Sequence, residues 1–285
     1  ITQAKKHEKE KPFFAYVAFN APHDPRQSPK EYVDKYPLDR IAIPKNFLPM
    51  YPYKDKIGCQ HGLRDEKLGP MPRTEHSVKV HRQEYYAIIT HMDVQIGRIL
   101  NALEKSGMAK DTYVFFSADH GLAVGHHGLF GKQNLYEHST RVPFIVKGPE
   151  IPKGTKVSAP VYLQDVMASS LEIAGVEKPE HVQFNSVLPL AKGETKKSNY
   201  DAIYGAYLSV QRSVTVKDKK LILYPKVPVA RLYDIAADPM EMKDLAKDET
   251  NLALMRKLFA RFLKLQKETG DTLDLKNSFP ALAKK

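Results

Sequence analysis

The chain has 285 residues and a formal net charge of +11, from 44 Lys and Arg against 33 Asp and Glu. Hydrophobic residues make up 42% and charged residues 27%, a balance that excludes a disordered chain, a collagen and a membrane bundle. The single cysteine, Cys59, excludes an internal disulfide framework and a cysteine-based zinc finger. We therefore expect one large globular domain or two unequal ones.

The positive charge has several interpretations. A Lys-rich solvated surface explains it without any ligand. An anionic substrate or a nucleic acid would explain it functionally. The sequence has no recognised DNA- or RNA-binding motif, no Trp, and no stripe in which aromatic residues alternate with Lys and Arg. We therefore expect no nucleic-acid partner, and no membrane partner because no stretch reaches roughly 18 apolar residues.

The first two-thirds of the chain alternates predicted strands and helices. Residues 13–19 are apolar without interruption, which predicts a strand covered on both faces. A proline-rich region at 29–72 follows, and loops of that length are usually functional or disordered. Helical spacing of apolar residues then predicts a helix from about residue 75 to 106, ended by Gly107.

Two further strands are predicted at 112–117 and 142–146, followed by a helix at 163–174. This alternation predicts an α/β fold with a mostly parallel sheet flanked by helices, over residues 1–195. Short β-like runs and a helix at about 249–266 predict a smaller α+β subdomain over residues 196–285, with an antiparallel meander. We expect the tail after Gly270 to be loosely ordered.

Two polar pairs follow predicted strands, His23-Asp24 and Asp119-His120. Because ligands of such sheets bind beyond the carboxyl ends of the strands, the pairs predict a site. Asp119 and His120 offer an oxygen and an imidazole to a divalent cation, although a turn with ordinary hydrogen bonds explains the pair taken alone. His23 beside a carboxylate can act as a general acid, or it is an ordinary surface histidine.

A glycine-rich, cationic loop follows the second pair. Glycines let the backbone approach an oxyanion, and Lys132 supplies a mobile positive charge suited to sulfate or phosphate. The loop is not a Walker loop, because Gly131-Lys132 is followed by Gln133.

Together these segments resemble the type I, formylglycine-dependent sulfatases of the alkaline phosphatase superfamily. The resemblance rests on Pro22-His23-Asp24-Pro25 after an apolar segment, Ser117-Ala118-Asp119-His120-Gly121, Gly131-Lys132, and Leu232-Tyr233-Asp234 with Asp238-Pro239. It covers nearly the whole chain and implies the C-terminal half to two-thirds of such a protein. Residues 1–195 would then be the C-terminal part of the catalytic α/β domain.

The resemblance also implies roles for individual residues. Asp119 and His120 would be two ligands of one divalent cation, most often Ca²⁺, with Mg²⁺ or Mn²⁺ as alternatives. Lys132 would hold a sulfate oxygen and the bridging ester oxygen, and His23 would protonate the departing alcohol. Looser candidates for substrate contacts are Asp24, His126, His127 and Arg212.

The nucleophile of the family is a formylglycine made from Cys or Ser in a C/S-x-P/A-x-R motif. Cys59 does not fit this motif, because Pro is missing two residues later and Arg four residues later. We therefore expect the nucleophile to lie in an N-terminal region outside this chain, and the chain alone to be inactive.

The function expected from the resemblance is a sulfuric ester hydrolase acting on a sulfated small molecule or glycan. One alternative is a phosphonate monoester or phosphodiester hydrolase of the same superfamily. Another is a non-catalytic polyanion-binding fragment, which would bind with a steep salt dependence. By family analogy we expect a periplasmic or secreted protein, whose oligomeric state and sulfated position the sequence leaves open.

Overall fold

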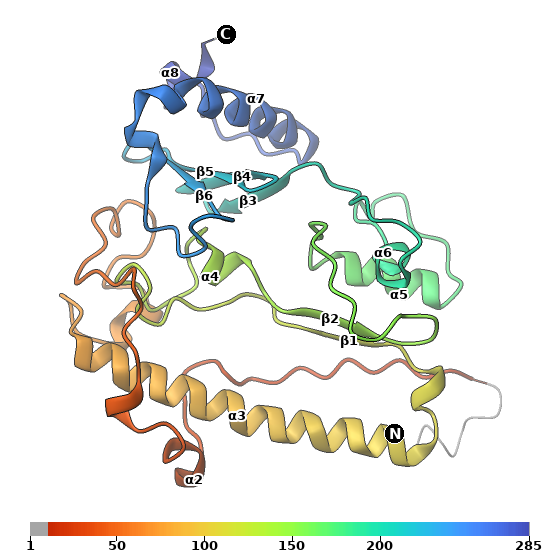
Figure 1. The fold of residues 1–285 in the computed structure, drawn as a ribbon. Coiled ribbons are helices and arrows are strands. Elements are labelled where there is room, and N and C mark those ends of the chain that lie inside the picture. The colour runs from red at the N-terminus through yellow and green to blue at the C-terminus, as the bar shows by residue number, and fades with distance from the viewer. Residues whose placement is uncertain (1–10, 285) are drawn as a thin grey trace.

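The computed structural model describes residues 11–284, and Figure 1 shows how its elements are arranged. A long helix, α3 (Glu75–Ser106), runs along one side of a two-stranded ribbon, while a four-stranded sheet lies beyond the ribbon and carries α7 (Leu252–Glu268) on its outer face. The shorter helices are α2 (Lys30–Val33), α4 (Glu137–Thr140), α5 (Asp165–Ile173), α6 (Leu188–Lys192) and α8 (Pro280–Ala283). Among residues 11–284, no helix combines the length and the apolar character needed to span a membrane.

The helix predicted at 75–106 is confirmed as α3. Its first turn is capped by Thr74, whose side chain accepts a hydrogen bond from the backbone N–H of Ser77 at 3.1 Å. It ends at Gly107, whose φ of 83° lies in the left-handed region that favours glycine. Val94 and Leu100 on this helix remain exposed, so its apolar side chains are only partly covered by the described residues.

The two strands predicted at 112–117 and 142–146 are confirmed as β1 (Val114–Ser117) and β2 (Phe144–Lys147). Their predicted parallel arrangement is wrong, because they pair antiparallel with Ser117 opposite Phe144. A parallel crossover usually needs a helix long enough to pack across the sheet. The connection here holds only the four-residue α4, so the chain returns beside the strand it has just left. Helices and strands together still agree with the predicted α/β class.

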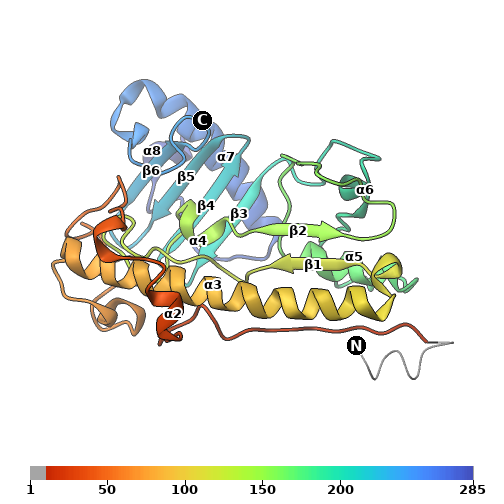
Figure 2. The ribbon, with the colours of Figure 1, turned by 60° about the horizontal axis from the view of Figure 1, so that its bottom comes forward.

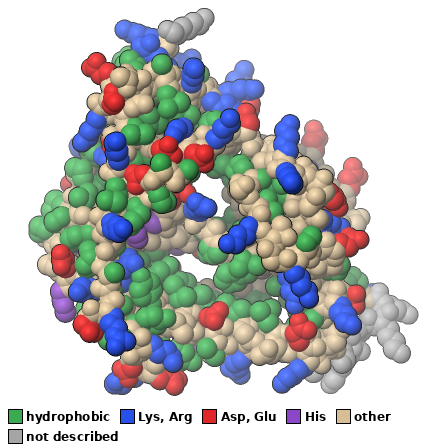
Figure 3. All heavy atoms as spheres, in the orientation of Figure 1, with side chains coloured by type: hydrophobic (Ala, Val, Ile, Leu, Met, Phe, Trp, Pro, Cys, Tyr) green, Lys and Arg blue, Asp and Glu red, His purple; other side chains and the backbone are tan. Residues whose placement is uncertain are grey.

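The strand predicted at residues 13–19 is extended but pairs with no strand among residues 11–284. It runs along α3 in both ribbon views (Figures 1 and 2), and Phe14 is 81% exposed. The prediction that both faces of this strand are covered is therefore wrong for the described residues. Figure 3, a space-filling view in the orientation of Figure 1, shows further hydrophobic side chains around the hollow in the middle of the molecule. Exposed apolar surface of this kind favours contact with additional protein.

The antiparallel meander predicted after residue 196 is confirmed as a sheet of order β3-β4-β5-β6. The strands are β3 (Ile203–Tyr207), β4 (Gln211–Val216), β5 (Lys219–Tyr224) and β6 (Val229–Asp234). Side chains alternate between the faces of a strand, so Leu221 and Leu223 pack with α7, while Ile222 and Tyr224 join a second cluster with Tyr51. This second cluster links the sheet to the proline-rich region, and the boundary between 195 and 196 stays a prediction.

The tail after Gly270, predicted to be loosely ordered, is packed against α7. Leu275, Phe279 and Leu282 are buried in the same cluster as Phe259. The prediction was wrong because these apolar residues are scattered among polar ones, so their spacing alone does not reveal that they share one face.

We expect Phe279→Ala to lower the free energy of unfolding by about 3–5 kcal/mol, the usual cost of removing a buried phenyl ring. Phe279 is 6% exposed, and its ring centroid lies 6.3 Å from that of Phe259. Urea unfolding followed by circular dichroism measures the change. The exposed Met242→Ala is the control and should change stability by less than about 0.5 kcal/mol. A cost below about 1 kcal/mol for Phe279→Ala would mean that the tail is not part of the core.

Candidate active site

The structure brings together the two residues predicted to be catalytic, His23 and Lys132. Lys132 Nζ lies 3.2 Å from His23 Nε2. The other ring nitrogen of His23, Nδ1, lies 2.8 Å from the backbone carbonyl oxygen of Asp24. An ammonium group can only donate hydrogen bonds, so Nε2 accepts, and Nδ1 carries the proton and donates it to the carbonyl. The side chain of Asp24, a predicted substrate contact, lies beside the ring, with Oδ1 3.3 Å from Nδ1.

Asp65 holds Lys132 in this position. Its carboxylate oxygen Oδ2 lies 3.2 Å from Lys132 Nζ and accepts a hydrogen bond from Gln133 Nε2 at 2.9 Å. Burial alone would raise the pKa of Asp65, but the hydrogen bonds from Gln133 and Lys132 outweigh it and lower that pKa below its ordinary value. The carboxylate therefore stays charged and keeps the ammonium group directed toward His23.

The neighbouring residue, Glu66, holds the backbone of the same loop. Its carboxylate accepts hydrogen bonds from the backbone N–H groups of Phe130, at 3.2 Å, and Gly131, at 2.9 Å. It also forms a fully buried ion pair with Arg73. Breaking such a pair by removing one partner typically costs about 3–5 kcal/mol.

Arg73 completes the attachment of this loop. Its Nε donates to the carbonyl of Gly128 at 3.2 Å, and its guanidinium carbon lies 4.1 Å from the ring centroid of Phe130. Asp65 and Glu66 belong to one 3₁₀ turn, Asp65–Leu68. Two consecutive carboxylates thus fix the loop, one through the side chain of Lys132 and the other through the backbone before it.

The predicted metal pair lies at the start of the same loop. Asp119 Oδ2 and His120 Nε2 are 3.4 Å apart, and the Asp119 side chain is 85% exposed. His120 Nδ1 donates to the carbonyl of Gly121 at 2.9 Å, which leaves Nε2 free to act as a ligand. Residues 11–284 contain no group of three or more His, Cys, Asp or Glu side chains suited to a metal ion. The pair therefore offers two ligands of a larger set.

The loop folds back so that its two ends lie close together. The backbone N–H of Ala123 donates to the carbonyl of Gly131 at 3.0 Å, which returns the chain before Lys132 toward the end that carries His120. Gly121 is required at this turn, because a Cβ there would lie 2.0 Å from the carbonyl oxygen of His138.

Comparison with known proteins identifies the family. A model of the sulfatase family matches residues 1–176, and a model of the N-sulphoglucosamine sulphohydrolase C-terminal region matches residues 125–268. This chain belongs to the sulfatase family. It is 32% identical to a sulfatase of Formosa agariphila over 81% of this chain and 45% of that protein. This sulfatase chain spans about half the length of the curated relatives it matches.

Solved structures show the fold of this sulfatase chain. It resembles BT4656, determined in complex with its substrate D-glucosamine-2-N,6-O-disulfate, with a TM-score of 0.75 and 22% identity over 90% of this chain and 65% of that one. It also resembles the phosphonate monoester hydrolase of Agrobacterium radiobacter, with a TM-score of 0.77 and 21% identity over 92% of this chain and 58% of that one. These similarities agree with the expected alkaline-phosphatase-like α/β fold.

Two residues that were predicted to contact substrate, Arg212 and His127, are buried and interact with other side chains of the protein. Arg212 is buried and donates to both carboxylate oxygens of Asp271, at 2.8 and 3.0 Å. His127 is buried and stacks on Tyr136, a member of the second cluster, with ring centroids 4.0 Å apart. Both side chains therefore have partners inside the protein, and a substrate contact by either of them stays a prediction.

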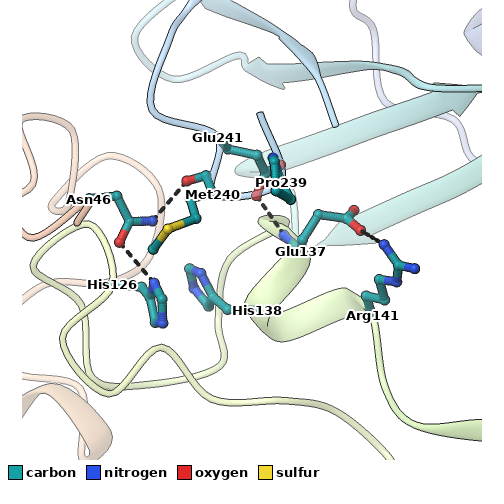
Figure 4. A pocket seen from close by; sticks show the side chains of 8 residues that line it. All are labelled: Asn46, His126, Glu137, His138, Arg141, Pro239, Met240 and Glu241. Carbon is teal, nitrogen blue, oxygen red and sulfur yellow. Dashed lines mark hydrogen bonds and ion pairs between the residues drawn. The ribbon is translucent and has the colours of Figure 1, made fainter. Parts of the chain in front are cut away.

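His126 lines a cavity of about 220 Å³ together with Asn46, His138 and Glu241 (Figure 4). Its Nδ1 lies 2.8 Å from Asn46 Oδ1, and Asn46 Nδ2 donates to the carbonyl of Met240 at 2.8 Å. His138 lies beside it, with ring centroids 5.4 Å apart. Neither His23 and Lys132 nor Asp119 and His120 line this cavity. A substrate contact by His126 stays a prediction.

Sequence reasoning missed Arg64, Asp65, Glu66 and Arg73. All four lie in or beside the proline-rich region, where runs of charge normally indicate a solvated surface. The length of that region was the only signal that it has a function. Cys59, in contrast, fits its predicted lack of a catalytic role, because it is fully buried and burial raises the pKa of its thiol.

The buried histidines make stability depend on pH. Burial lowers the pKa of His81 to about 4, that of His126 to about 4 and that of His127 to about 3. These rings stay neutral when folded, whereas in the unfolded chain they bind protons below about pH 6.5. We therefore expect the free energy of unfolding to fall between pH 6.5 and 5, by up to about 1.4 kcal/mol per pH unit for each histidine.

Urea unfolding at several pH values in this range measures the slope. His127→Gln should reduce the slope, because it removes one of the buried rings that resist protonation. His61→Gln, at an exposed histidine, should leave the slope unchanged. Equal slopes for the His127 and His61 variants would contradict this account.

Proposed function

We propose that this chain is part of a sulfuric ester hydrolase that removes sulfate from a sulfated carbohydrate. The observation that carries the proposal is the contact of His23 Nε2 with Lys132 Nζ, in a chain that belongs to the sulfatase family. Because the chain spans about half the length of its curated relatives, the activity is proposed for the whole protein that contains it.

His23 and Lys132 both act at the ester oxygen that leaves with the alcohol. His23 gives a proton from Nε2 to the oxygen of the departing alcohol, a step that typically contributes about 10²- to 10⁴-fold. For this step the ring must carry a proton on Nε2 in addition to the proton that Nδ1 donates to Asp24. Lys132 places a positive charge beside the ester oxygen, where negative charge develops. Asp65 keeps that ammonium group in place.

Asp119 and His120 would hold a divalent cation, with further ligands from outside the described residues. A carboxylate oxygen and an imidazole nitrogen fit Ca²⁺, Mg²⁺ or Mn²⁺ as part of a larger set, and Ca²⁺ is our proposal from the family resemblance. When bound, such a cation supplies positive charge to the sulfate oxygens. We also propose that a formylglycine outside this chain supplies the nucleophile, and that the protein is periplasmic or secreted.

A carbohydrate substrate is supported by two observations. The structural neighbour BT4656 has a disulfated glucosamine as its substrate, and the net charge of +11 on this chain favours a polyanion. The second candidate function, hydrolysis of a phosphonate monoester, is favoured by the similar fold of the phosphonate monoester hydrolase of Agrobacterium radiobacter.

Comparison of para-nitrophenyl sulfate with para-nitrophenyl phenylphosphonate tests the proposed function in the whole protein. We expect kcat/KM for the sulfate to exceed that for the phosphonate. Lys132→Ala should lower kcat/KM for the sulfate about 10²- to 10³-fold, as expected when one positive contact to the reacting group is lost. The thermal melting temperature of that variant should stay close to that of the wild type.

The exposed Lys30→Ala serves as the control and should retain wild-type turnover. A phosphonate turnover far above the sulfate turnover would favour the second candidate function. Near-normal sulfate turnover by Lys132→Ala would exclude the proposed role of that residue.

A further inference from the structure

Two basic side chains, Arg64 and Lys132, converge on a single atom of His23. Arg64 Nη2 lies 2.8 Å from His23 Nε2, and Lys132 Nζ lies 3.2 Å from the same nitrogen. A neutral imidazole nitrogen has one lone pair and accepts one good hydrogen bond. Two cationic donors therefore share an acceptor that can satisfy only one of them. An anion bound at this point would accept hydrogen bonds that the protein leaves unused.

Arg64 is the most exposed of the charged side chains around His23. Its side chain is 64% exposed, whereas the carboxylate of Asp65 beside it is almost fully buried. Arg64 Nε and Nη2 donate to Asp65 Oδ1 at 3.2 and 3.1 Å, and Asp24 Oδ2 lies 3.7 Å from Nε. These carboxylates orient one edge of the guanidinium group. The rest of the group faces solvent, where a planar set of donors suits a carboxylate or a sulfate.

The position of Arg64 relative to His23 indicates which part of a substrate it meets. In the proposed function, on which this inference rests, His23 Nε2 faces the oxygen of the departing alcohol. A guanidinium in contact with that nitrogen therefore lies on the side of the alcohol rather than behind the sulfur atom. Lys132 contacts the same nitrogen, but its side chain is only 18% exposed and is held by Asp65, so the more exposed Arg64 is the cation that can reach a further group on the alcohol.

We propose that Arg64 is a specificity-determining residue that binds a second anionic group, a carboxylate or a further sulfate, on the alcohol part of the substrate. Binding of that anion draws the guanidinium away from His23. Nε2 then keeps its contact with Lys132 and loses the one with Arg64, which opens space for the departing oxygen. The preferred substrates are esters whose alcohol already carries a negative charge, such as multiply sulfated sugars or sulfated uronic acids.

A matched pair of substrates tests this proposal in the whole protein. They are meta-carboxyphenyl sulfate and its methyl ester, which differ only in the negative charge on the leaving group. We expect the ratio of kcat/KM for the acid to kcat/KM for the ester to fall about 10- to 100-fold in Arg64→Gln, the loss expected for one hydrogen-bonded charge contact. Arg64→Lys should give an intermediate ratio, because a lysine keeps the charge but not the planar donors.

Arg98→Gln is the control, since Arg98 is an exposed residue of α3 whose side chain donates to Gln95 Oε1 at 2.7 Å. Its ratio should equal that of the wild type. Equal losses for the acid and the ester in Arg64→Gln would overturn the proposal, since that result means that Arg64 only positions His23. A wild-type protein that hydrolyses neither sulfate overturns the proposed function instead.

A binding measurement tests the role of Arg64 in anion binding separately from the proposed catalytic activity. Calorimetric titration of the wild type with D-glucosamine-2-N,6-O-disulfate should give a dissociation constant about tenfold lower than titration of Arg64→Gln, independently of turnover. Identical dissociation constants for the two proteins would overturn the role of Arg64 in anion binding. Where Arg64→Gln does not fold, as judged by thermal melting, Arg64→Lys carries both measurements.

Discussion

The buried ion pair between Glu66 and Arg73 fixes the loop on which the candidate active site depends. Two charges of opposite sign out of contact with water persist only when each is fully hydrogen bonded. Here Glu66 accepts from the backbone of the loop and Arg73 donates to the carbonyl of Gly128. Because the next carboxylate along the chain, Asp65, contacts Lys132, the position of the ammonium group follows from the position of this pair.

The second cluster of buried side chains stabilises the loop that carries Lys132. Tyr51 from the proline-rich region hydrogen bonds to Tyr136 at 2.8 Å and to Tyr224 at 2.9 Å. The loop, the proline-rich region and the C-terminal sheet therefore share one packed interior. Residues 13–19 and part of α3 differ from this region, because they keep apolar side chains exposed. The described residues thus combine a well-packed site region with an incompletely covered surface.

Local signals in the sequence predicted most of the helices and strands. Contacts between residues that are distant in the sequence were mostly not predicted. Apolar spacing and Gly107 predicted the helix at 75–106, and the family resemblance assigned His23 and Lys132 to one active site. The antiparallel return of β2 and the burial of Phe279 depend on partners that are distant in the sequence. Asp65 and Glu66 are consecutive charges, which propensity assigns to a surface, yet tertiary contacts bury them.

The most direct test of this account is a double-mutant cycle on kcat/KM for para-nitrophenyl sulfate in the whole protein, using His23→Ala, Lys132→Ala and the double variant. Residues that act as a unit on the same atom lose their effect together. We predict that the double variant is only slightly slower than the slower single variant. Losses that multiply in the double variant would contradict the account, because they would mean that His23 and Lys132 act independently.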